Sequence, residues 1–418
     1  MTQNGSMKVT QTPLAPKANG SRLGCCVVCA SERSQPIFAV KEAPIHPVCP
    51  PATLGLEPGF GVLDIVACTG CGHIYNAGFN PNRVDELYAA NVLTNTPVSD
   101  TMLKGLESTA DFILSRGPAN PSVVDVGGGS GVLAILLARR AREVHLVEPS
   151  RALVPEHFAS QGVTLHSSMF PPPALAGRQF EILLSRQVLE HIPSPDGFLA
   201  AIRSHVRPDG IVFLELPSEE YIENTLSIVD FHYPHVHYYR RRELETLFAR
   251  AGFAVVETVD IKNGHDAGFI LRPVAPHAAS APSASADATA FAAALADRRR
   301  LGGERLAALK GTTALYGANA YSQAFLGLYP HAAKFGIVFD DTPMYEGQRA
   351  YGPGIDIEIR PPDAARLKAV DAIVITAYLH DVVINRKLQT FGFQGAVYTV
   401  RADALSGTGG APPSLFQV

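Results

Sequence analysis

The sequence predicts an α/β protein with three units, and three observations support this class. In the central part of the 418-residue chain, short apolar runs alternate with amphipathic segments, which is typical of a parallel sheet covered by helices. A second and shorter alternation of the same kind fills residues 301–418. Residues 23–85 differ from both, because they are dense in cysteine, proline and glycine and show little apolar periodicity.

The composition is that of an ordinary globular chain. It is 46% hydrophobic and 18% charged, which is enough apolar material for buried cores. The net charge of −4 and the lack of a basic tract give no reason to expect nucleic acid as a partner. No apolar run approaches the roughly 20 residues that span a bilayer. Residues 1–22 are small and polar without a signal-peptide core, so we expect a flexible tail, no membrane partner and a cytoplasmic location.

The cysteines of the N-terminal unit are grouped in two C-x-x-C pairs. Without a secretion signal the thiols stay reduced, so the pairs favour a metal over disulfides. Each pair places two sulfurs on one tight turn, and two such turns complete the tetrahedron that Zn²⁺ prefers. The predicted ligands are Cys26, Cys29, Cys68 and Cys71. Cys25 and Cys49 are left over, and a redox pair or two unrelated clusters are the competing interpretations.

The unit around these cysteines also needs stabilisation beyond a hydrophobic core. Its stretch "APIHPVCPPATLGLEPGFG" is rich in proline and glycine, so we expect loops and a small core there. A closed shell of four thiolates leaves no open position for catalysis. We therefore expect the zinc ion to be structural.

The central unit reads as a doubly wound sheet. The runs "SVVDVG", "EVHLVE", "FEILLS" and "GIVFLELP" are short apolar strands. The segments "LKGLESTADFILSR", "GVLAILLARRA" and "PDGFLAAIRSHV" have the spacing of amphipathic helices. Farther along, "RRRELETLFARAGF" is expected to be a solvated amphipathic helix.

Residues 274–300 are rich in alanine and separate the two alternating units. The first half is expected to be a flexible linker and the second half, from about Ala286, a helix. Beyond it, "TALYGANAYSQAFLGLY", "KFGIVFDD" and "DAIVITA" are interpreted as strand-type runs of a smaller Rossmann-like unit.

A glycine-rich loop follows the first strand of the central unit, in "VVDVGGGSGVLAILLA". Gly127, Gly129 and Gly131 let the backbone approach a ligand closely, and the following helix directs free N–H groups at it. The spacing G-x-G-x-G lacks the third glycine of a dinucleotide fingerprint. Asp125 would repel a pyrophosphate, so it suits a ligand with an ammonium and a sulfonium group. Glu148 ends the second strand, where a carboxylate can accept hydrogen bonds from both ribose hydroxyls.

Together with "RQVLEHI" and "RPDGIVFLELP", these motifs resemble the class I S-adenosylmethionine-dependent methyltransferases. The resemblance implies that the three loop glycines pack on the methionine part of the cofactor and that Glu148 holds its ribose. By position it also implies that Ser168 and Met169 contact the adenine and that Gln187 lies near the sulfonium.

The whole chain further resembles the three-domain sugar C-methyltransferases. The segments "CGHIYNAGFNP", "YGANAYSQAFL", "VFDDTPMYEGQ" and "AIVITAY" carry this resemblance. It implies a small-molecule acceptor, a nucleotide-linked 4-keto-6-deoxysugar, whose carbon 3 is methylated through an enolate. The expected parts are a flexible tail (1–22), a zinc-binding domain (23–85), a methyltransferase domain (86–273), an alanine-rich linker and helix (274–300) and a Rossmann-like domain (301–418).

The resemblance also points to a base in "DFHYPHVHYY", residues 230–239. His235 falls on the family's base position, and imidazole suits proton abstraction beside a carbonyl. The catalytic candidates are His235, His232 and Tyr233. The family has a glutamate where this chain has Pro234, and a tyrosine where it has His232.

These departures leave other acceptors open. One alternative is an oxygen, nitrogen or sulfur methyltransferase on another small metabolite, because a heteroatom nucleophile needs less assistance than an enolate. Another is a protein that binds the cofactor without methyl transfer. A metal bound by His232, His235 and His237 is disfavoured, because residues 235 and 237 share one face of an extended strand and residue 232 faces the other way.

Overall fold

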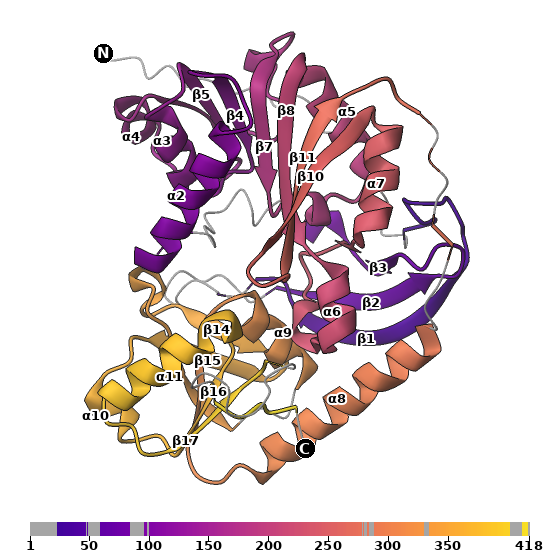
Figure 1. Ribbon diagram of the computed structural model, residues 1–418. Coiled ribbons are helices and arrows are strands. Elements are labelled where there is room, and N and C mark those ends of the chain that lie inside the picture. Colours follow the sequence, from indigo (N-terminus) through magenta and orange to yellow (C-terminus); the bar gives the residue numbers. More distant parts are fainter. Residues whose placement is uncertain are drawn as a thin grey trace, which may run out of the picture.

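The computed structural model describes most of the chain (Figure 1). The described residues are 23–46, 48, 59–83, 96–97, 100–277, 279, 282–283, 288–329, 334–401 and 412–416. The expected tail of residues 1–22 and Cys49 lie outside them. None of the helices in these ranges is long and apolar enough to cross a membrane.

A seven-stranded sheet forms the central unit, in the order β10-β11-β8-β7-β4-β5-β6. Five neighbours, β8, β7, β4, β5 and β6, run parallel, and β11 pairs antiparallel with both β8 and β10. The strands are β4 (Ser122–Val126), β5 (Glu143–Val147), β6 (Val163–His166), β7 (Phe180–Arg186), β8 (Val206–Pro217), β10 (Phe253–Ile261) and β11 (Asp266–Pro273). The predicted alternation of strands and helices is confirmed.

Helices cover both faces of this sheet (Figure 1). The apolar runs are buried on both faces because successive side chains of a strand point to opposite sides. Leu183 packs with α5 and α7, whereas Ile182 and Leu184 pack with α2 and α3. The helices are α2 (Asp100–Leu114), α3 (Val132–Ala138), α4 (Pro155–Ser160), α5 (Pro195–His205), α6 (Glu219–Thr225) and α7 (Arg241–Arg250).

The strand order reverses at β4, which lies between β5 and β7. In an open α/β sheet, such a reversal leaves a crevice outside the carboxyl ends of the strands. The glycine-rich loop after β4, Glu148 after β5 and Gln187 after β7 therefore meet at one edge.

The N-terminal unit is more regular than its composition predicts. Strands β1 (Ser34–Pro44) and β2 (Phe60–Cys68) form a long antiparallel pair that the sequence analysis did not predict. The stretch expected to form loops, residues 43–61, lies mostly outside the described residues. The apolar side chains of Ile37, Val40 and Ala43 in the first strand are buried against the rest of the molecule. Strand β3 (Ile74–Asn76) continues the sheet, and β9 (His237–Tyr238) from the central unit pairs with β3 as its edge strand.

The C-terminal unit contains a six-stranded sheet in the order β14-β15-β13-β12-β16-β17. All neighbours are parallel except β14 and β15. Its elements are β12 (Thr313–Tyr316), α9 (Ala320–Leu328), β13 (Phe335–Phe339), β14 (Arg349–Gly352), β15 (Ile355–Arg360), α10 (Ala364–Leu367), β16 (Ala372–Ile375), α11 (Asp381–Thr390) and β17 (Ala396–Thr399).

The interpretation of "TALYGANAYSQAFLGLY" as a strand-type run was wrong beyond Tyr316. Gly317 takes a φ of 110° and ends the strand. The side chain of Asn319 then accepts hydrogen bonds from the amides of Tyr321 and Ser322, which starts α9. The helix expected from about Ala286 is α8 (Ala288–Ala308), which lies along β1 (Figure 1).

Candidate functional site

The glycine-rich loop after β4 is tightly folded. Gly127 and Gly131 have φ angles of 71° and 72°, which side-chain-bearing residues rarely adopt. A Cβ on Gly127 would meet Val188 at 2.4 Å, and one on Gly131 would meet Phe158 at 2.4 Å. The loop therefore requires glycine at both positions, as a close backbone approach to a ligand would also require.

Glu148 holds the loop from the neighbouring strand. One carboxylate oxygen accepts a hydrogen bond from the amide of Gly129 at 2.9 Å, and the other from the amide of Ser150 at 3.0 Å. The side chain is largely buried, and this burial raises its pKa. Glu148 thus lies beside the loop, where the sequence predicted an acidic side chain.

Asp125 lies beneath the loop with one unsatisfied carboxyl oxygen. The side chain is buried, and its Oδ2 has no hydrogen-bond partner among the described residues. Burial raises its pKa to about 7, with Glu148 adding to the shift and Arg186 opposing it. A buried carboxyl oxygen without a partner beside a glycine-rich loop fits a cationic group of a ligand, such as the ammonium group of S-adenosylmethionine.

Ser168, Met169 and Gln187 are the three positions that the methyltransferase resemblance implied by location alone. Ser168 donates a hydrogen bond to the carbonyl oxygen of Met169 at 3.1 Å, and Met169 is 57% exposed. Gln187 has a φ of 56° and donates from Nε2 to Asp266 at 3.0 Å. Its side chain is therefore directed at the hairpin between β10 and β11.

A buried cluster of imidazoles lies where the segment after β7 meets residues 230–239. His232 and His235 have ring centroids 3.8 Å apart, and His191 packs edge-on against His235 at 4.8 Å. Burial lowers the pKa of His232 to about 3 and that of His191 to about 4, and it lowers that of His235 well below its ordinary value. All three rings are therefore neutral near pH 7, which is the form that a general base requires.

Glu190 completes this cluster. It lies in the short helix η4 (Leu189–His191), and its Oε1 is 3.7 Å from Nε2 of His191 and 3.9 Å from Nε2 of His235. Three ligand atoms from Glu190, His191 and His235 lie within 4.8 Å of one another, so this group has the donor set of a divalent metal site. The sequence analysis assigned no role to Glu190.

The other aromatic residues of 230–239 have structural partners. The hydroxyl of Tyr233 donates to the carbonyl oxygen of Asn80 at 3.2 Å, which ties it to the N-terminal unit. His237 contacts His73 at 3.1 Å between ring nitrogens. Tyr238 donates to the carbonyl oxygen of His232 at 3.4 Å. This places His235 and His232 in the cluster, whereas the Tyr233 hydroxyl is directed away from it.

A separate, charged cluster surrounds His265, and the sequence analysis did not predict it. His265, in the turn between β10 and β11, contacts Asp266 at 2.6 Å through Nδ1 and Asp230 at 2.9 Å through Nε2. Tyr378 of the C-terminal unit donates to Asp230 at 2.8 Å. Against the opposing effect of burial, the two carboxylates raise the pKa of His265 to about 9. Only the dipeptide "HD" in a turn signals this site, and its partners lie 35 residues upstream and in another unit.

The four predicted cysteine ligands converge. Sγ of Cys26 lies 3.5 Å from Sγ of Cys71, and Sγ of Cys29 lies 3.4 Å from Sγ of Cys68. All four sulfurs lie within 4.8 Å of one another. A tetrahedral zinc ion with bonds of about 2.3 Å would separate its sulfurs by about 3.8 Å, so the arrangement fits zinc. Cys25 is exposed and outside the group.

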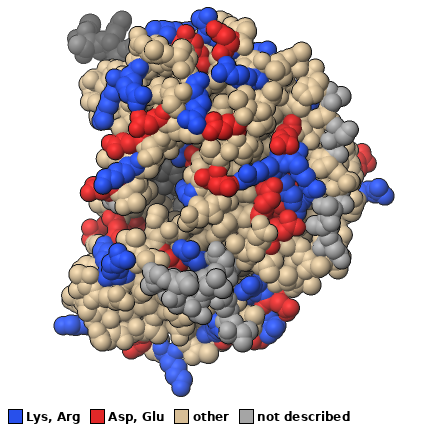
Figure 2. All heavy atoms as spheres, in the orientation of Figure 1, with Lys and Arg blue, Asp and Glu red and all other residues tan. Residues whose placement is uncertain are grey.

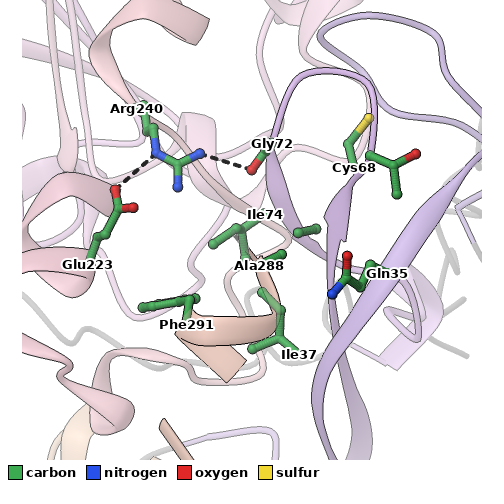
Figure 3. Close-up of a pocket in the computed structure, with 11 residues that line it drawn as sticks. Gln35, Ile37, Cys68, Gly72, Ile74, Glu223, Arg240, Ala288 and Phe291 are labelled. Carbon is green, nitrogen blue, oxygen red and sulfur yellow. Dashed lines mark hydrogen bonds and ion pairs between the residues drawn. The ribbon is translucent and has the colours of Figure 1, made fainter. Parts of the chain in front are cut away.

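A cavity of about 200 Å³ lies between the N-terminal sheet and α8 (Figure 3). Arg240 lines it, but its guanidinium already contacts Glu219, Glu223 and the carbonyl oxygen of Gly72. An anionic ligand would have to displace these partners. The following helix, α7, is amphipathic as predicted: Leu244, Leu247 and Phe248 are buried, whereas Glu245 and Arg250 are exposed. Elsewhere, Figure 2 shows cationic and anionic side chains interspersed over one face of the molecule.

Comparisons with known proteins concern the central unit. Residues 101–258 match the family model described as a methyltransferase domain. A ubiquinone biosynthesis O-methyltransferase from Ralstonia nicotianae is 34% identical over 110 residues, which cover 25% of this chain and 46% of that protein. A ubiquinone biosynthesis O-methyltransferase from Burkholderia pseudomallei is 25% identical over 151 residues, which cover 32% of this chain and 65% of that protein. The chain thus spans less than two thirds of these relatives.

Two solved structures align with part of the chain. An S-adenosylmethionine-dependent methyltransferase from Clostridium acetobutylicum aligns with a TM-score of 0.35 and 14% identity, over 40% of this chain and 90% of that one. A magnesium protoporphyrin IX methyltransferase from Synechocystis with bound SAM aligns with a TM-score of 0.32 and 15% identity, over 41% and 79% of the two chains.

Proposed function

We propose that this chain, which carries a class I S-adenosylmethionine-dependent methyltransferase domain, transfers a methyl group to a small-molecule acceptor. One observation carries the proposal: the carboxyl group of Asp125 is buried without a partner for Oδ2, directly beneath the glycine loop that Glu148 holds. This constellation offers one group for a cation and one for a ribose.

The residues proposed to hold the cofactor surround this loop. Asp125 receives the ammonium group, and Glu148 receives the ribose hydroxyls. Gly127, Gly129 and Gly131 line the methionine part, Ser168 and Met169 the adenine, and Gln187 the region of the sulfonium. When bound, S-adenosylmethionine supplies an electrophilic methyl group.

The first candidate reaction is carbon methylation of a keto-sugar nucleotide or a similar ketone. His235 is the proposed base, because its ring lies beside Glu190 and His191, which follow the carboxyl end of β7. It takes a proton from the carbon next to the carbonyl, and the electron pair of that bond moves into the enolate. His232 packs on the base, and Tyr233 holds the segment from behind through Asn80.

The second candidate is methylation of an oxygen, nitrogen or sulfur atom on another metabolite. The matched relatives are O-methyltransferases, and Pro234 lacks the side chain of the family's glutamate. A third possibility, cofactor binding without methyl transfer, is an outcome of the same experiment.

Zinc is proposed as a structural ion in the N-terminal unit. Cys26, Cys29, Cys68 and Cys71 form a closed set of four sulfurs, which would leave no position for a substrate. Its role would be to fix the two turns beside β2 and β3.

Methyl-labelled cofactor and mass spectrometry test the proposal. Purified protein is incubated with 4-keto-6-deoxysugar nucleotides and, separately, with hydroxyl, amine and thiol acceptors. A product with one added methyl group on a sugar carbon supports the first candidate, and transfer only to heteroatoms supports the second. His235→Ala should abolish solvent deuterium exchange at the acceptor carbon, whereas the exposed His277→Ala should not. Retained exchange in His235→Ala would remove the base role.

A further inference from the structure

The carboxyl group of Glu190 is buried without a hydrogen-bond partner. Its residue is 1% exposed, and neither carboxyl oxygen has a partner among the described residues. The main chain is nevertheless fixed, because the carbonyl oxygen of Glu190 accepts a hydrogen bond from the amide of Val236 at 2.8 Å. Buried polar groups are almost always satisfied, so an exception beside a candidate base calls for a functional explanation.

Two imidazoles face this carboxyl group. Its Oε1 lies 3.9 Å from Nε2 of His235 and 3.7 Å from Nε2 of His191. Nδ1 of His191 lies 2.8 Å from the carbonyl oxygen of Pro234. A carbonyl oxygen only accepts, so Nδ1 of His191 carries the hydrogen and its Nε2 presents a lone pair to Glu190. A protonated Glu190 can therefore donate to His191 and accept from His235.

The charges around the pair favour neutral groups. Burial raises the pKa of Glu190 well above its ordinary value, with Asp266 and Glu215 adding to the shift and Lys262 opposing it. Burial lowers the pKa of His235, and His232, His191 and His265 lower it further. An imidazolium alone at this position is therefore disfavoured. An imidazolium beside a carboxyl oxygen that accepts its N–H group is disfavoured less.

We propose that Glu190 is the positioning residue of His235: its carboxyl oxygen accepts the Nε2–H of His235 and so leaves the lone pair of Nδ1 for the acceptor's proton. The inference rests on the proposed function. A movement of about 1 Å converts the 3.9 Å separation into a hydrogen bond, and catalytic hydrogen bonds often tighten only in the substrate complex.

The proton that leaves the acceptor is taken up by His235, so the step balances without another proton carrier. The C–H bond of the acceptor breaks and an N–H bond forms at Nδ1 of His235, while the electron pair passes into the enolate. Nε2 keeps its hydrogen throughout and donates a hydrogen bond to Glu190. The carboxyl group thus orients the imidazole, as the aspartate does in a serine-protease triad. Glu190 thus supplies, from η4, the carboxyl group that Pro234 cannot supply at its own position.

Nitrogen NMR of ¹⁵N-histidine-labelled full-length protein tests this without an acceptor. The signals of His235 are assigned by their loss in His235→Gln, and the tautomer is read in wild type, Glu190→Leu and the matched surface control Glu257→Leu. Leucine has nearly the size of glutamate and offers no acceptor. We expect Nε2 of His235 to be protonated in wild type and the control. In Glu190→Leu, we expect the ring to shift toward a tautomer mixture. An unchanged tautomer in folded Glu190→Leu would overturn the proposal.

Metal analysis of the same samples covers the rival explanation. A second divalent ion per chain in wild type, beyond the zinc and lost in Glu190→Leu, would make Glu190 a ligand and also overturn it. Once an acceptor is known, Glu190→Leu should lower kcat between about 10²- and 10⁴-fold with little change in KM, and Glu190→Asp should restore part of the rate. A changed tautomer without any methylated product would refute the proposed function and leave the pairing of Glu190 with His235 intact.

Discussion

Nε2 of His265 lies 2.9 Å from Oδ1 of Asp230, and this contact joins two segments of the central unit at the point where the C-terminal unit touches them. Tyr378 donates to the second oxygen of Asp230, and the hydroxyl of Tyr321 lies 3.2 Å from the same histidine nitrogen. The imidazolium is thus the central charge of a buried cluster that joins the C-terminal unit to the central unit.

This cluster predicts a pH-dependent stability. The folded-state pKa of His265 is raised to about 9, above the unfolded value of about 6.5. Its contribution is therefore complete below pH 6.5 and is lost as the pH rises through 9, for a total of about 3 kcal/mol. Urea unfolding between pH 6 and 9.5 measures it. The decline should be absent in His265→Gln and present in the exposed control His277→Gln. Equal declines in both variants would contradict the assignment.

The glycine loop predicts a specific defect in Gly131→Ala. The new Cβ would lie 2.4 Å from Phe158 in a backbone conformation that alanine resists. We expect a loss of about 1–3 kcal/mol of unfolding free energy and loss of cofactor binding. The control is Gly197→Ala in α5, where a Cβ meets nothing within 4 Å. It should be neutral or stabilising by up to about 1 kcal/mol, and similar behaviour of both variants would count against the loop's tight geometry.

The cysteine group predicts zinc-dependent folding. Elemental analysis should find one zinc ion per chain in wild type and none in Cys71→Ser, whose sulfur is buried among the other three. Loss of the ion should lower the unfolding free energy by about 4 kcal/mol or more.

The neighbouring cysteine provides the control for the zinc prediction. Cys25 is exposed and lies outside the group, so Cys25→Ser should retain both the zinc and the stability of wild type. Wild type without zinc, or with stability unaffected by a strong chelator, would rule the site out.

Local patterns sufficed for the central sheet and not for the cluster beside it. The strands around Val124 and Leu183 were predictable because they are continuous apolar runs between helical segments. Glu148 was predictable because its place depends only on where β5 ends. Glu190 and His265 were not, because their partners lie 45 and 35 residues away and no periodicity links them. The N-terminal strands were missed because prolines and glycines surround them.

The relation of residues 230–239 to the rest of the molecule could not be read from the sequence either. His237 and Tyr238 form β9 and pair with Tyr75 and Ile74 of the N-terminal sheet. His232 and His235 instead face the central unit. One short segment therefore belongs to two units, which explains why its histidines have unequal environments.

Calorimetric titration of S-adenosylhomocysteine into the full-length protein tests the central claim most directly. Wild type should bind one molecule per chain. Glu148→Ala should lose at least tenfold in affinity because the ribose contact and the hold on the Gly129 amide disappear together, while the exposed control Glu156→Ala should bind like wild type. Absence of binding by folded wild-type protein, or equal binding by Glu148→Ala, would contradict the assignment of this loop as the cofactor site.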